Sequence, residues 1–419
     1  MASQTFRSLN ERNAKVFFLG LLVSNVGTWV QITAMSALVY RITGRATDVG
    51  LTIATQFLPM LLFGAWAGAL ADRSNRRKMT LITQGLLAAQ ATLLGVLDLT
   101  GHINLTGMYA LSLAMGMINA IDNPARRGFV IELVDPTNIS NAMSLNTAVM
   151  TGSRIFGPAL AAVLTKSVGT GWCFIINAVS FAAILLALLS MDKNNLRPPT
   201  VAPRGGKPVR EALRFVRGNR RVLVVFAILA ISSTFAFNYS VSFLRLADKR
   251  FGDEQLFGWL LATTSIGSLI GSLRVANRQR VQVRDLLICA TYVGCAGLAV
   301  SWAPNTLVAF VCCVPLGYGG AGLISCSNAI AQQECPPEMR SRLLALVAVA
   351  FLGSTPIGSP ITGWIADHVG AEWSLAYGSI ITLGLVLVAG ILLARPGAKL
   401  DSRPQSDGDF ATIGPVVQT

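Results

Sequence analysis

The sequence predicts an all-α membrane protein of twelve transmembrane helices arranged as two pseudo-symmetric six-helix bundles. Three observations lead to this fold class. Of 419 residues, 53% are hydrophobic and only 13% are charged, whereas soluble domains carry about 25% charged residues. Apolar stretches of roughly 20 residues, long enough to cross the bilayer as helices, recur along nearly the whole chain. Parts of the second half also repeat the spacing of the first.

The twelve predicted spans follow one another with short polar segments between them. In chain order they are 16–40, 48–71, 79–98, 104–122, 141–165, 172–191, 222–246, 256–276, 285–302, 305–325, 342–366 and 373–394. Gly and Pro inside them are tolerated because neighbouring helices satisfy the backbone. The segment before the first span is polar and lacks a short apolar stretch with a cleavage site, so we expect no removed signal peptide.

The basic residues predict the orientation of the spans. A net charge of +14 is also typical of nucleic-acid-binding surfaces, but here the charges lie in short loops between spans. With the N-terminus inside, 27 of the 34 Lys and Arg residues fall in inner segments and six in outer ones. The positive-inside rule therefore predicts a multi-pass protein of the plasma or inner membrane with both termini cytoplasmic, and no nucleic-acid partner.

An internal repeat divides the chain. Shifting the sequence by 201 residues, or by 208 near the start, superimposes residues at shared spacing: Asn104 on Asn305, Gly116 on Gly317, Gly157 on Gly358, Gly169 on Gly370, Gly44 on Gly252, and Gly50 on Gly258. Parallel repeats of this kind surround a central cavity. We expect an N-terminal bundle at 1–191, a cytoplasmic loop at 192–221, a C-terminal bundle at 222–395 and a disordered cytoplasmic tail at 396–419.

An arginine lies near the centre of the fifth span. Arg154 has no acidic partner in mid-span anywhere in the sequence, and a charge at that depth costs about 2.5–3.5 kcal/mol on insertion scales. Such a residue normally faces a cavity. Two interpretations stay open: Arg154 binds a carboxylate or phenolate of the substrate, or carbonyls and hydroxyls neutralise it structurally.

The segment 68–78 between the second and third spans carries Gly68, Asp72, Arg73 and Arg76, followed by two further basic residues. This pattern resembles the motif Gly-x-x-x-Asp-Arg-x-x-Arg-Arg-Lys of the major facilitator superfamily, at the same place in the fold, and the likeness extends over about 15–395. A glycine here suits close helix approach, and an acid at a helix end suits a hydrogen-bonded or ionic contact. The alternative is that the basic residues only set topology.

The resemblance implies a latch at the inner side. Asp122 ends the predicted fourth span, and in similar transporters an acid at this place pairs with the loop arginine and holds the outward-open state. We expect Asp72, Arg76 and Asp122 to form this latch, with Gly68 and Arg73 beside them. Asp122 as a solvated helix end is the alternative.

The fifth span also carries Gly152, Gly157 and Pro158, which loosely resemble the antiporter motif of major facilitator exporters. Residues 122–181 are further similar to the exporter branch that includes enterobactin and macrolide efflux proteins. A Gly-Pro pair kinks a helix and permits close packing, so ordinary packing is the alternative. As polar or aromatic candidates for the substrate cavity we predict Asn25, Trp29, Gln31, Asn146, Arg154, Asn238 and Tyr239.

The resemblance implies an efflux transporter of a drug, secondary metabolite or siderophore, working as a monomer and driven by the proton gradient. The lack of a mid-span acid weakens the evidence for proton coupling. A lipid flippase of the same fold, moving lysophospholipid, is the alternative function. With two His residues and no metal-ligand spacing among the seven Cys, we expect no metal, cofactor or enzyme activity. A static receptor would have no use for a latch.

Overall fold

The computed structural model describes residues 4–192, 195–197, 208–278, 280–336 and 339–394, and all elements in these segments are helices. This confirms the all-α prediction. The helices are η1 Gln4–Asn10, α1 Arg12–Thr43, α2 Ala46–Arg73, α3 Arg76–Leu99, α4 Leu105–Glu132, η2 Pro136–Asn138, α5 Ile139–Ser167, α6 Thr170–Ser190, α7 Pro208–Gly218, α8 Arg220–Ala236, α9 Tyr239–Lys249, α10 Leu256–Ala276, α11 Val283–Ser301, α12 Thr306–Gln333, α13 Arg340–Leu352, α14 Thr355–His368 and α15 Trp373–Ala394.

The number of membrane-crossing helices is consistent with the predicted twelve. Within the described residues, eleven helices or consecutive helix pairs are long and apolar enough to cross a membrane. The remaining long helix, α4, has 28 residues but places Asp122, Arg126 and Glu132 in its last turns. Its counterpart in the repeat, α12, is also 28 residues long, so we treat the first part of α4 as the twelfth span.

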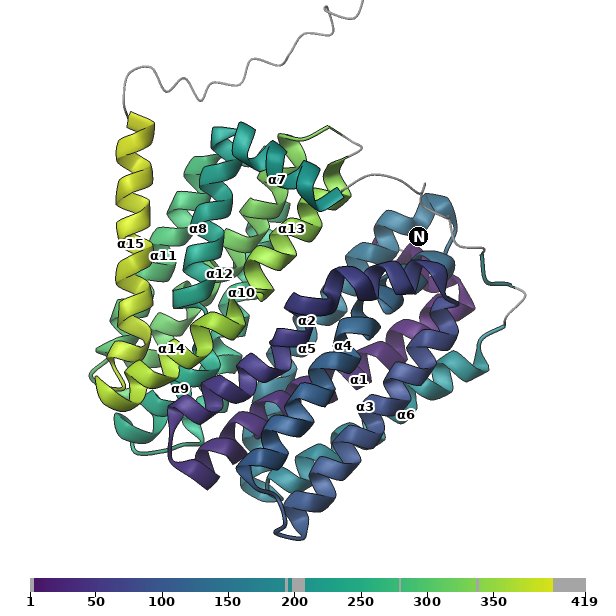
Figure 1. The fold of residues 1–419 in the computed structure, drawn as a ribbon, viewed down its shortest axis with the longest axis horizontal. Coiled ribbons are helices and arrows are strands. Elements are labelled where there is room, and N and C mark those ends of the chain that lie inside the picture. The colour runs from purple at the N-terminus through teal and green to yellow at the C-terminus, as the bar shows by residue number, and fades with distance from the viewer. Residues whose placement is uncertain (1–3, 193–194, 198–207, 279, 337–338, 395–419) are drawn as a thin grey trace, which may run out of the picture.

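The helices form two groups that lie side by side, α1–α6 and α8–α15 (Figure 1). In the first group α1 packs on α5 and α6, and α2 packs on α4; in the second, α10 and α11 pack on α12. The groups touch where α2 meets α14, α5 meets α10, and α1 meets α9. We call these groups the N half and the C half.

Three local features differ from the predicted spans. The central loop contains α7, a short helix that buries Ala212 and Val216. The seventh span is split into α8 and α9, and the eleventh into α13 and α14. Pro356 in the first turn of α14 explains the second break, because proline lacks an N–H and clashes with the preceding turn. The predicted tail, 396–419, lies outside the described residues.

Equivalent glycines make equivalent helix contacts in the two halves. A Cβ on Gly116 of α4 would lie 2.1 Å from the carbonyl oxygen of Gln56 in α2, and one on Gly317 of α12 would lie 1.8 Å from that of Thr264 in α10. Only glycine permits such close approach. The offset of 201 relates the glycines and the offset of 208 relates their partners, so the sequence repeat is a repeat of helix packing.

The five described glycines with positive φ, at positions 44, 101, 169, 252 and 370, all lie at one end of the molecule. This is the end whose loops are predicted to face outside, and we call it the outer end. Gly44 and its repeat counterpart Gly252 have nearly equal φ values, 66° and 70°, which suit the left-handed ends of helices. We call the opposite end, which carries the loop between α2 and α3, the inner end.

Candidate functional site

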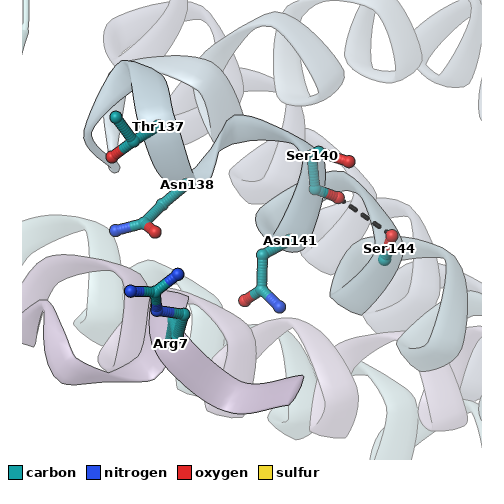
Figure 2. A pocket seen from close by; sticks show the side chains of 6 residues that line it. All are labelled: Arg7, Thr137, Asn138, Ser140, Asn141 and Ser144. Carbon is teal, nitrogen blue, oxygen red and sulfur yellow. Dashed lines mark hydrogen bonds between the residues drawn. The ribbon is translucent and has the colours of Figure 1, made fainter. Parts of the chain in front are cut away.

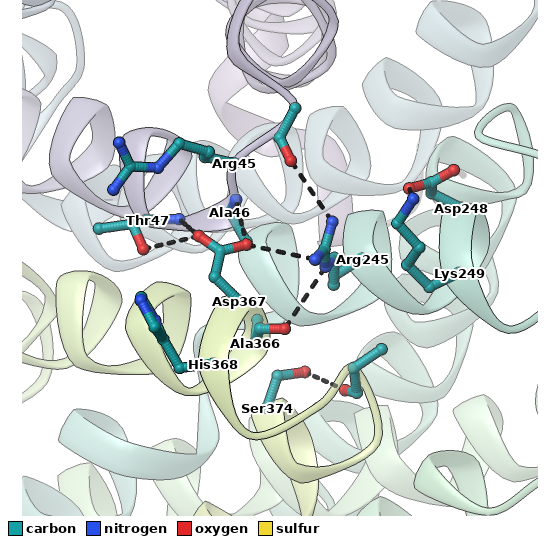
Figure 3. Close-up of polar contacts among 12 residues, drawn as sticks. Arg45, Ala46, Thr47, Arg245, Asp248, Lys249, Ala366, Asp367, His368 and Ser374 are labelled. Atoms are coloured by element: carbon teal, nitrogen blue, oxygen red, sulfur yellow. Dashed lines mark hydrogen bonds and ion pairs between the residues drawn. The ribbon is translucent and has the colours of Figure 1, made fainter.

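The two halves are joined by polar contacts at the outer end. Asp367, near the end of α14, accepts hydrogen bonds from the backbone N–H groups of Ala46 (2.9 Å) and Thr47 (2.8 Å) and from the Thr47 hydroxyl (2.7 Å) (Figure 3). Ala46 and Thr47 open α2, whose own N-cap residue, Arg45, makes no side-chain capping bond. A carboxylate at a helix N-terminus satisfies free N–H groups and complements the helix dipole. The C half therefore caps a helix of the N half.

Arg245 of α9 extends this polar cluster. Its guanidinium lies 3.6 Å from Asp367 and donates to the Tyr40 hydroxyl at 2.7 Å and to the Gly44 carbonyl at 3.4 Å. Tyr40, at the end of α1, donates in turn to Asp248 of α9. Tyr40 and Gly44 belong to the N half, and the other three residues to the C half. We call Tyr40, Ala46, Thr47, Arg245, Asp248 and Asp367 the outer cluster.

The contacts between the halves stop near the middle of the membrane. Gly258 of α10 faces the Pro158 carbonyl of α5, and further in the Ser265 hydroxyl donates to the carbonyl oxygen of Arg154 at 2.9 Å. Among the described residues, this is the hydrogen bond between the halves that lies farthest from the outer end. A Cβ on Gly353 would also meet the Leu61 side chain, 2.8 Å away. The structure is therefore closed at the outer end, without polar contacts between the described parts of the halves at the inner end.

Arg154 lies where this closure ends. Its side chain is exposed, and it lies between Trp29 of α1 and Ser265 of α10, where the two halves meet. Its guanidinium stacks over the Trp29 ring of α1, with 5.2 Å to the ring centroid. Thr147, two turns earlier on the same face of α5, is also exposed. An exposed face of α5 therefore runs from Arg154 toward the inner end, and we refer to the space beside it as the cavity.

The other predicted cavity residues have varied surroundings. The Asn25 amide donates to the Met150 sulfur at 3.2 Å. Asn146 is buried, with an amide oxygen that has no partner in the described part of the chain. Tyr239 stacks on Phe243 with 5.3 Å between ring centroids, and its buried hydroxyl has no partner there either. These residues keep unused polar groups close to the middle of the protein.

Gln31 and Asn238, also predicted to line the cavity, are instead satisfied by neighbours within their own halves. Gln31 is 1% exposed, donates to Gln90 at 3.0 Å and accepts from Asn177 at 2.6 Å. Asn238 accepts from Ser359 at 2.8 Å and donates to the carbonyl one turn earlier in α8. A buried amide is stabilised by such bonds, so these two residues hold helices together within one half.

At the inner end, Asp122 is 1% exposed and makes bonds inside the N half. Its carboxylate lies 2.9 Å from Arg126, and it accepts from Thr83 (2.7 Å) and Gln84 (2.9 Å) of α3. The predicted partner Arg76 contacts a different acid, Glu132, at 3.4 Å. Asp122 is therefore bonded to α3 and Arg126, and not to Arg76 as in the latch predicted from the resemblance.

The loop motif itself is partly described. The side chain of Asp72 lies outside the described residues. Arg73 is exposed, and a Cβ added to Gly68 would meet nothing within 4 Å, so the close approach predicted at Gly68 is not made in this conformation. At the inner end of α4, beyond the predicted span, burial raises the pKa of Glu132 above its ordinary value, while Arg76 lowers it.

The glycines of the motif in α5 differ in their surroundings. A Cβ on Gly157 would lie 2.2 Å from the Trp29 Cβ, whereas one on Gly152 would meet nothing within 4 Å. Gly157 is therefore required by the contact between α1 and α5, and it places Trp29 beside Arg154. Pro158 faces the C half through its carbonyl, as described above.

A separate polar pocket of about 280 Å³ lies at the inner end, between η1 and the start of α5 (Figure 2). Its lining residues are Arg7, Thr137, Asn138, Ser140, Asn141 and Ser144. Asn141 accepts from the Ser8 hydroxyl at 2.6 Å and fastens η1 to α5. Since the pocket belongs to the N half alone, it is not part of the cavity at Arg154. In the part of the chain that the structure describes, no group of His, Cys, Asp or Glu residues could hold a metal ion.

Sequence reasoning missed the outer cluster. Its acids and bases were interpreted as outer-loop charges, and Asp367 is 320 residues from Thr47 along the chain. The uncapped start of α2 was a signal that could have been used, because a helix N-terminus without Ser, Thr, Asp or Asn at the cap needs another acceptor.

Comparison with known proteins places this architecture in a family. Residues 3–412 match the profile of the family described as transmembrane secretion effectors. The staphyloferrin A transporter of Staphylococcus aureus is 21% identical over 391 residues, which cover 92% of this chain and 98% of that protein. The multidrug efflux pump Tap of Mycolicibacterium fortuitum is 26% identical, with 91% and 96% covered. Macrolide efflux protein A of Streptococcus pyogenes is 23% identical, with 81% and 86% covered.

Solved structures share the fold at low sequence identity. The nucleoside transporter NupG superimposes with a TM-score of 0.72 at 11% identity, covering 92% of this chain and all of that one. A bacterial homologue of the lysosomal transporter Spinster gives 0.69 at 14% identity, with 92% and 96% covered. The family match confirms the resemblance to the major facilitator superfamily, and the solved structures confirm the predicted fold class.

Proposed function

We propose that this chain, which belongs to the transmembrane secretion effector family of major facilitator transporters, exports a small organic molecule from the cytoplasm by alternating access. As a member of this family it is a secondary transporter and not an enzyme. Relatives named for staphyloferrin A, for multiple drugs and for macrolides support a small organic cargo.

One observation carries the alternating-access proposal. Every hydrogen bond between the described parts of the two halves lies at the outer end or at Arg154, and the cavity below Arg154 is exposed. Two compact halves joined at one end only can rock about their contact, closing the inner end as the outer end opens. This conformation is then the inward-open state, in which cargo enters from the cytoplasm.

The orientation and location belong to the same proposal. The excess of Lys and Arg in the inner segments supports cytoplasmic termini and insertion in the cytoplasmic membrane. Each half completes its own helix packing, and the transport path lies between the two halves of a single chain. We therefore propose that the protein works as a monomer in the lipid bilayer.

The inner end is proposed to carry the second gate. Gly68 faces open space in the present state, so its small size is of use only in a state where α2 approaches a helix of the C half. We propose that Asp72, Arg73 and Arg76 form the polar part of that closed gate, and that Asp122 holds α3 and α4 as its base. The contacts of Asp122 with Thr83 and Gln84 support the latter role.

Proton exchange is the proposed driving force. The helices that meet at Arg154, namely α1, α5 and α10, contain no Asp or Glu. A coupling proton must therefore bind toward the ends of the path, and we propose Asp122, which is buried between α4 and α3. Neutralising it would release Arg126 and α3 together, which links protonation to helix movement.

The test is accumulation of a fluorescent amphiphile panel in cells without their own efflux pumps. We expect cells with the wild type to accumulate less dye than empty cells, and expect this difference to vanish with a protonophore and, at equal amounts of folded protein in the membrane, with Asp122→Asn. Lys166→Ala, an exposed basic residue at the outer end of α5, is the control and should behave as wild type. Equal accumulation in wild-type and empty cells would contradict export of such dyes. Export that survives the protonophore would contradict proton coupling alone.

A further inference from the structure

The Arg154 guanidinium is an unpaired, exposed cation where the two halves meet. Within the described residues it makes no ion pair or hydrogen bond, and its single recorded side-chain contact is the Trp29 ring. A charge held at mid-membrane depth normally pairs with an acid or with backbone carbonyls. The helices that meet at Arg154, namely α1, α5 and α10, contain no Asp or Glu, so the preference of the guanidinium for an anion is left unsatisfied.

The contact with Trp29 leaves the N–H donors of the guanidinium without a hydrogen bond in the described part of the chain. The ring centroid lies 5.2 Å from the central carbon of the guanidinium, and the N–H donors of such a group point outward in its plane. The backbone of Arg154 is also fixed, because Ser265 binds its carbonyl from the opposite half. The guanidinium thus offers a planar pair of N–H donors on a backbone that is held in place. Such a pair is suited to two parallel hydrogen bonds with a carboxylate.

The electrostatic surroundings favour an anion further. Arg127 of α4, a second cation, acts electrostatically on Arg154, and it is exposed as well. Two exposed cations that act on one another favour a positive potential on this side of the cavity. A cationic ligand would have to enter against that potential, while an anion would be attracted along it.

We propose that the cargo is an amphipathic organic anion, whose carboxylate binds the Arg154 guanidinium edge and whose apolar or aromatic body lies against Trp29. This inference deepens the proposed export function and rests on it. It names the class of cargo by the chemistry of the site: one carboxylate next to an apolar body. Removing the charge should weaken binding of the anion about 10- to 100-fold, the range expected for hydrogen bonds to a charged group.

The experiment compares three probes with one scaffold: pyrenebutyrate, the neutral pyrenebutyramide and the cationic pyrenebutylamine. Binding is measured by fluorescence on the purified full chain in detergent, and transport of the same probes on proteoliposomes. The variants are Arg154→Ala and Arg154→Lys, with Lys166→Ala as the control on the same helix. Since binding in detergent needs no gradient and no gate movement, it is read independently of export.

We expect the wild type and Lys166→Ala to bind pyrenebutyrate at least about tenfold more tightly than the amide or the amine. Arg154→Ala should lose this preference while still binding the amide, which shows that the variant is folded. Arg154→Lys should keep the preference for an anion but bind it several-fold more weakly, because lysine lacks the planar fork. Equal wild-type affinity for the three probes, or no binding of pyrenebutyrate, overturns the anion proposal. Binding with this preference but without transport leaves the site standing and contradicts export of this probe.

Discussion

Removing the Asp367 carboxylate should open the outer end. Asp367→Ala deletes the two hydrogen bonds that cap α2, a third from the Thr47 hydroxyl, and the 3.6 Å contact with Arg245. Loss of a helix cap costs about 0.5–2 kcal/mol, and each bond to a charged group contributes about 1.5–3 kcal/mol when well shielded. The Asp367 side chain is only 10% exposed. We therefore expect a shift of about 1–3 kcal/mol toward the outer-open state, or about 5- to 150-fold in the equilibrium constant.

The assay is a distance distribution between two nitroxide labels in a cysteine-free chain, one at His102 in the N half and one at Pro304 in the C half. Both positions are exposed loops at the outer end. Asp367→Ala should add a longer distance that the parent chain lacks. Asp98→Ala is the matched control, because Asp98 pairs with Arg41 at 3.3 Å inside the N half and should leave the distance unchanged. Identical distributions for both variants would show that the outer cluster does not hold the outer end closed.

The remaining predictions concern residues inside one half. Gly157→Leu should abolish transport because α1 occupies the space of the side chain, whereas Gly152→Leu should be tolerated; equal activity of the two variants would contradict this packing. Asp122→Asn should lower the stability of the detergent-purified protein by about 3–5 kcal/mol, because buried Arg126 loses its partner; an unchanged melting temperature would show that the pair is not important for stability. Gln31→Leu should destabilise the protein by about 1–3 kcal/mol, because Gln90 and Asn177 lose a hydrogen-bond partner, without changing the affinity for pyrenebutyrate. A changed affinity would show that Gln31 does contribute to the binding site.

The sequence was sufficient for the fold because the relevant signals are local. Apolar length predicts a span without knowledge of its neighbours, and the repeated glycines mark where equivalent helices touch. Asn104 and Asn305 illustrate this: each accepts from the N–H group three residues later and begins a 28-residue helix. The split spans were missed because hydropathy does not distinguish one apolar helix from two consecutive short ones.

The candidate site was only partly predictable because polarity alone does not reveal which side of a helix a residue occupies. Arg154 was identified because a charged side chain at mid-membrane depth costs free energy on every helix face except one that lines a cavity. Gln31 and Asn238 carry no such cost once a neighbouring helix offers a partner. A buried amide in a span is thus compatible with both packing and binding, whereas an unpaired arginine is difficult to accommodate by packing.

The outer closure shows how a symmetric backbone can carry asymmetric chemistry. Gly50 of α2 packs on the Ser359 carbonyl of α14, and Gly258 of α10 packs on the Pro158 carbonyl of α5. The offset of 208 relates Gly50 to Gly258, and the offset of 201 relates Pro158 to Ser359. The contact between α2 and α14 and the contact between α5 and α10, which we call the two seams, are therefore equivalent in packing.

Their polar groups are not equivalent. The offset of 201 relates Asp367, which caps α2, to Lys166, and a basic residue cannot accept hydrogen bonds from the N–H groups of α10. Only the seam between α2 and α14 therefore holds a capped helix end, and the seam between α5 and α10 closes by packing and the single bond of Ser265. Of these two seams only the first depends on a carboxylate, so a change of charge at the outer end acts on it and on the contact of Tyr40 with Asp248 between α1 and α9. The repeat predicts that two seams exist, but the choice of which one is polar depends on single residues that the repeat does not preserve.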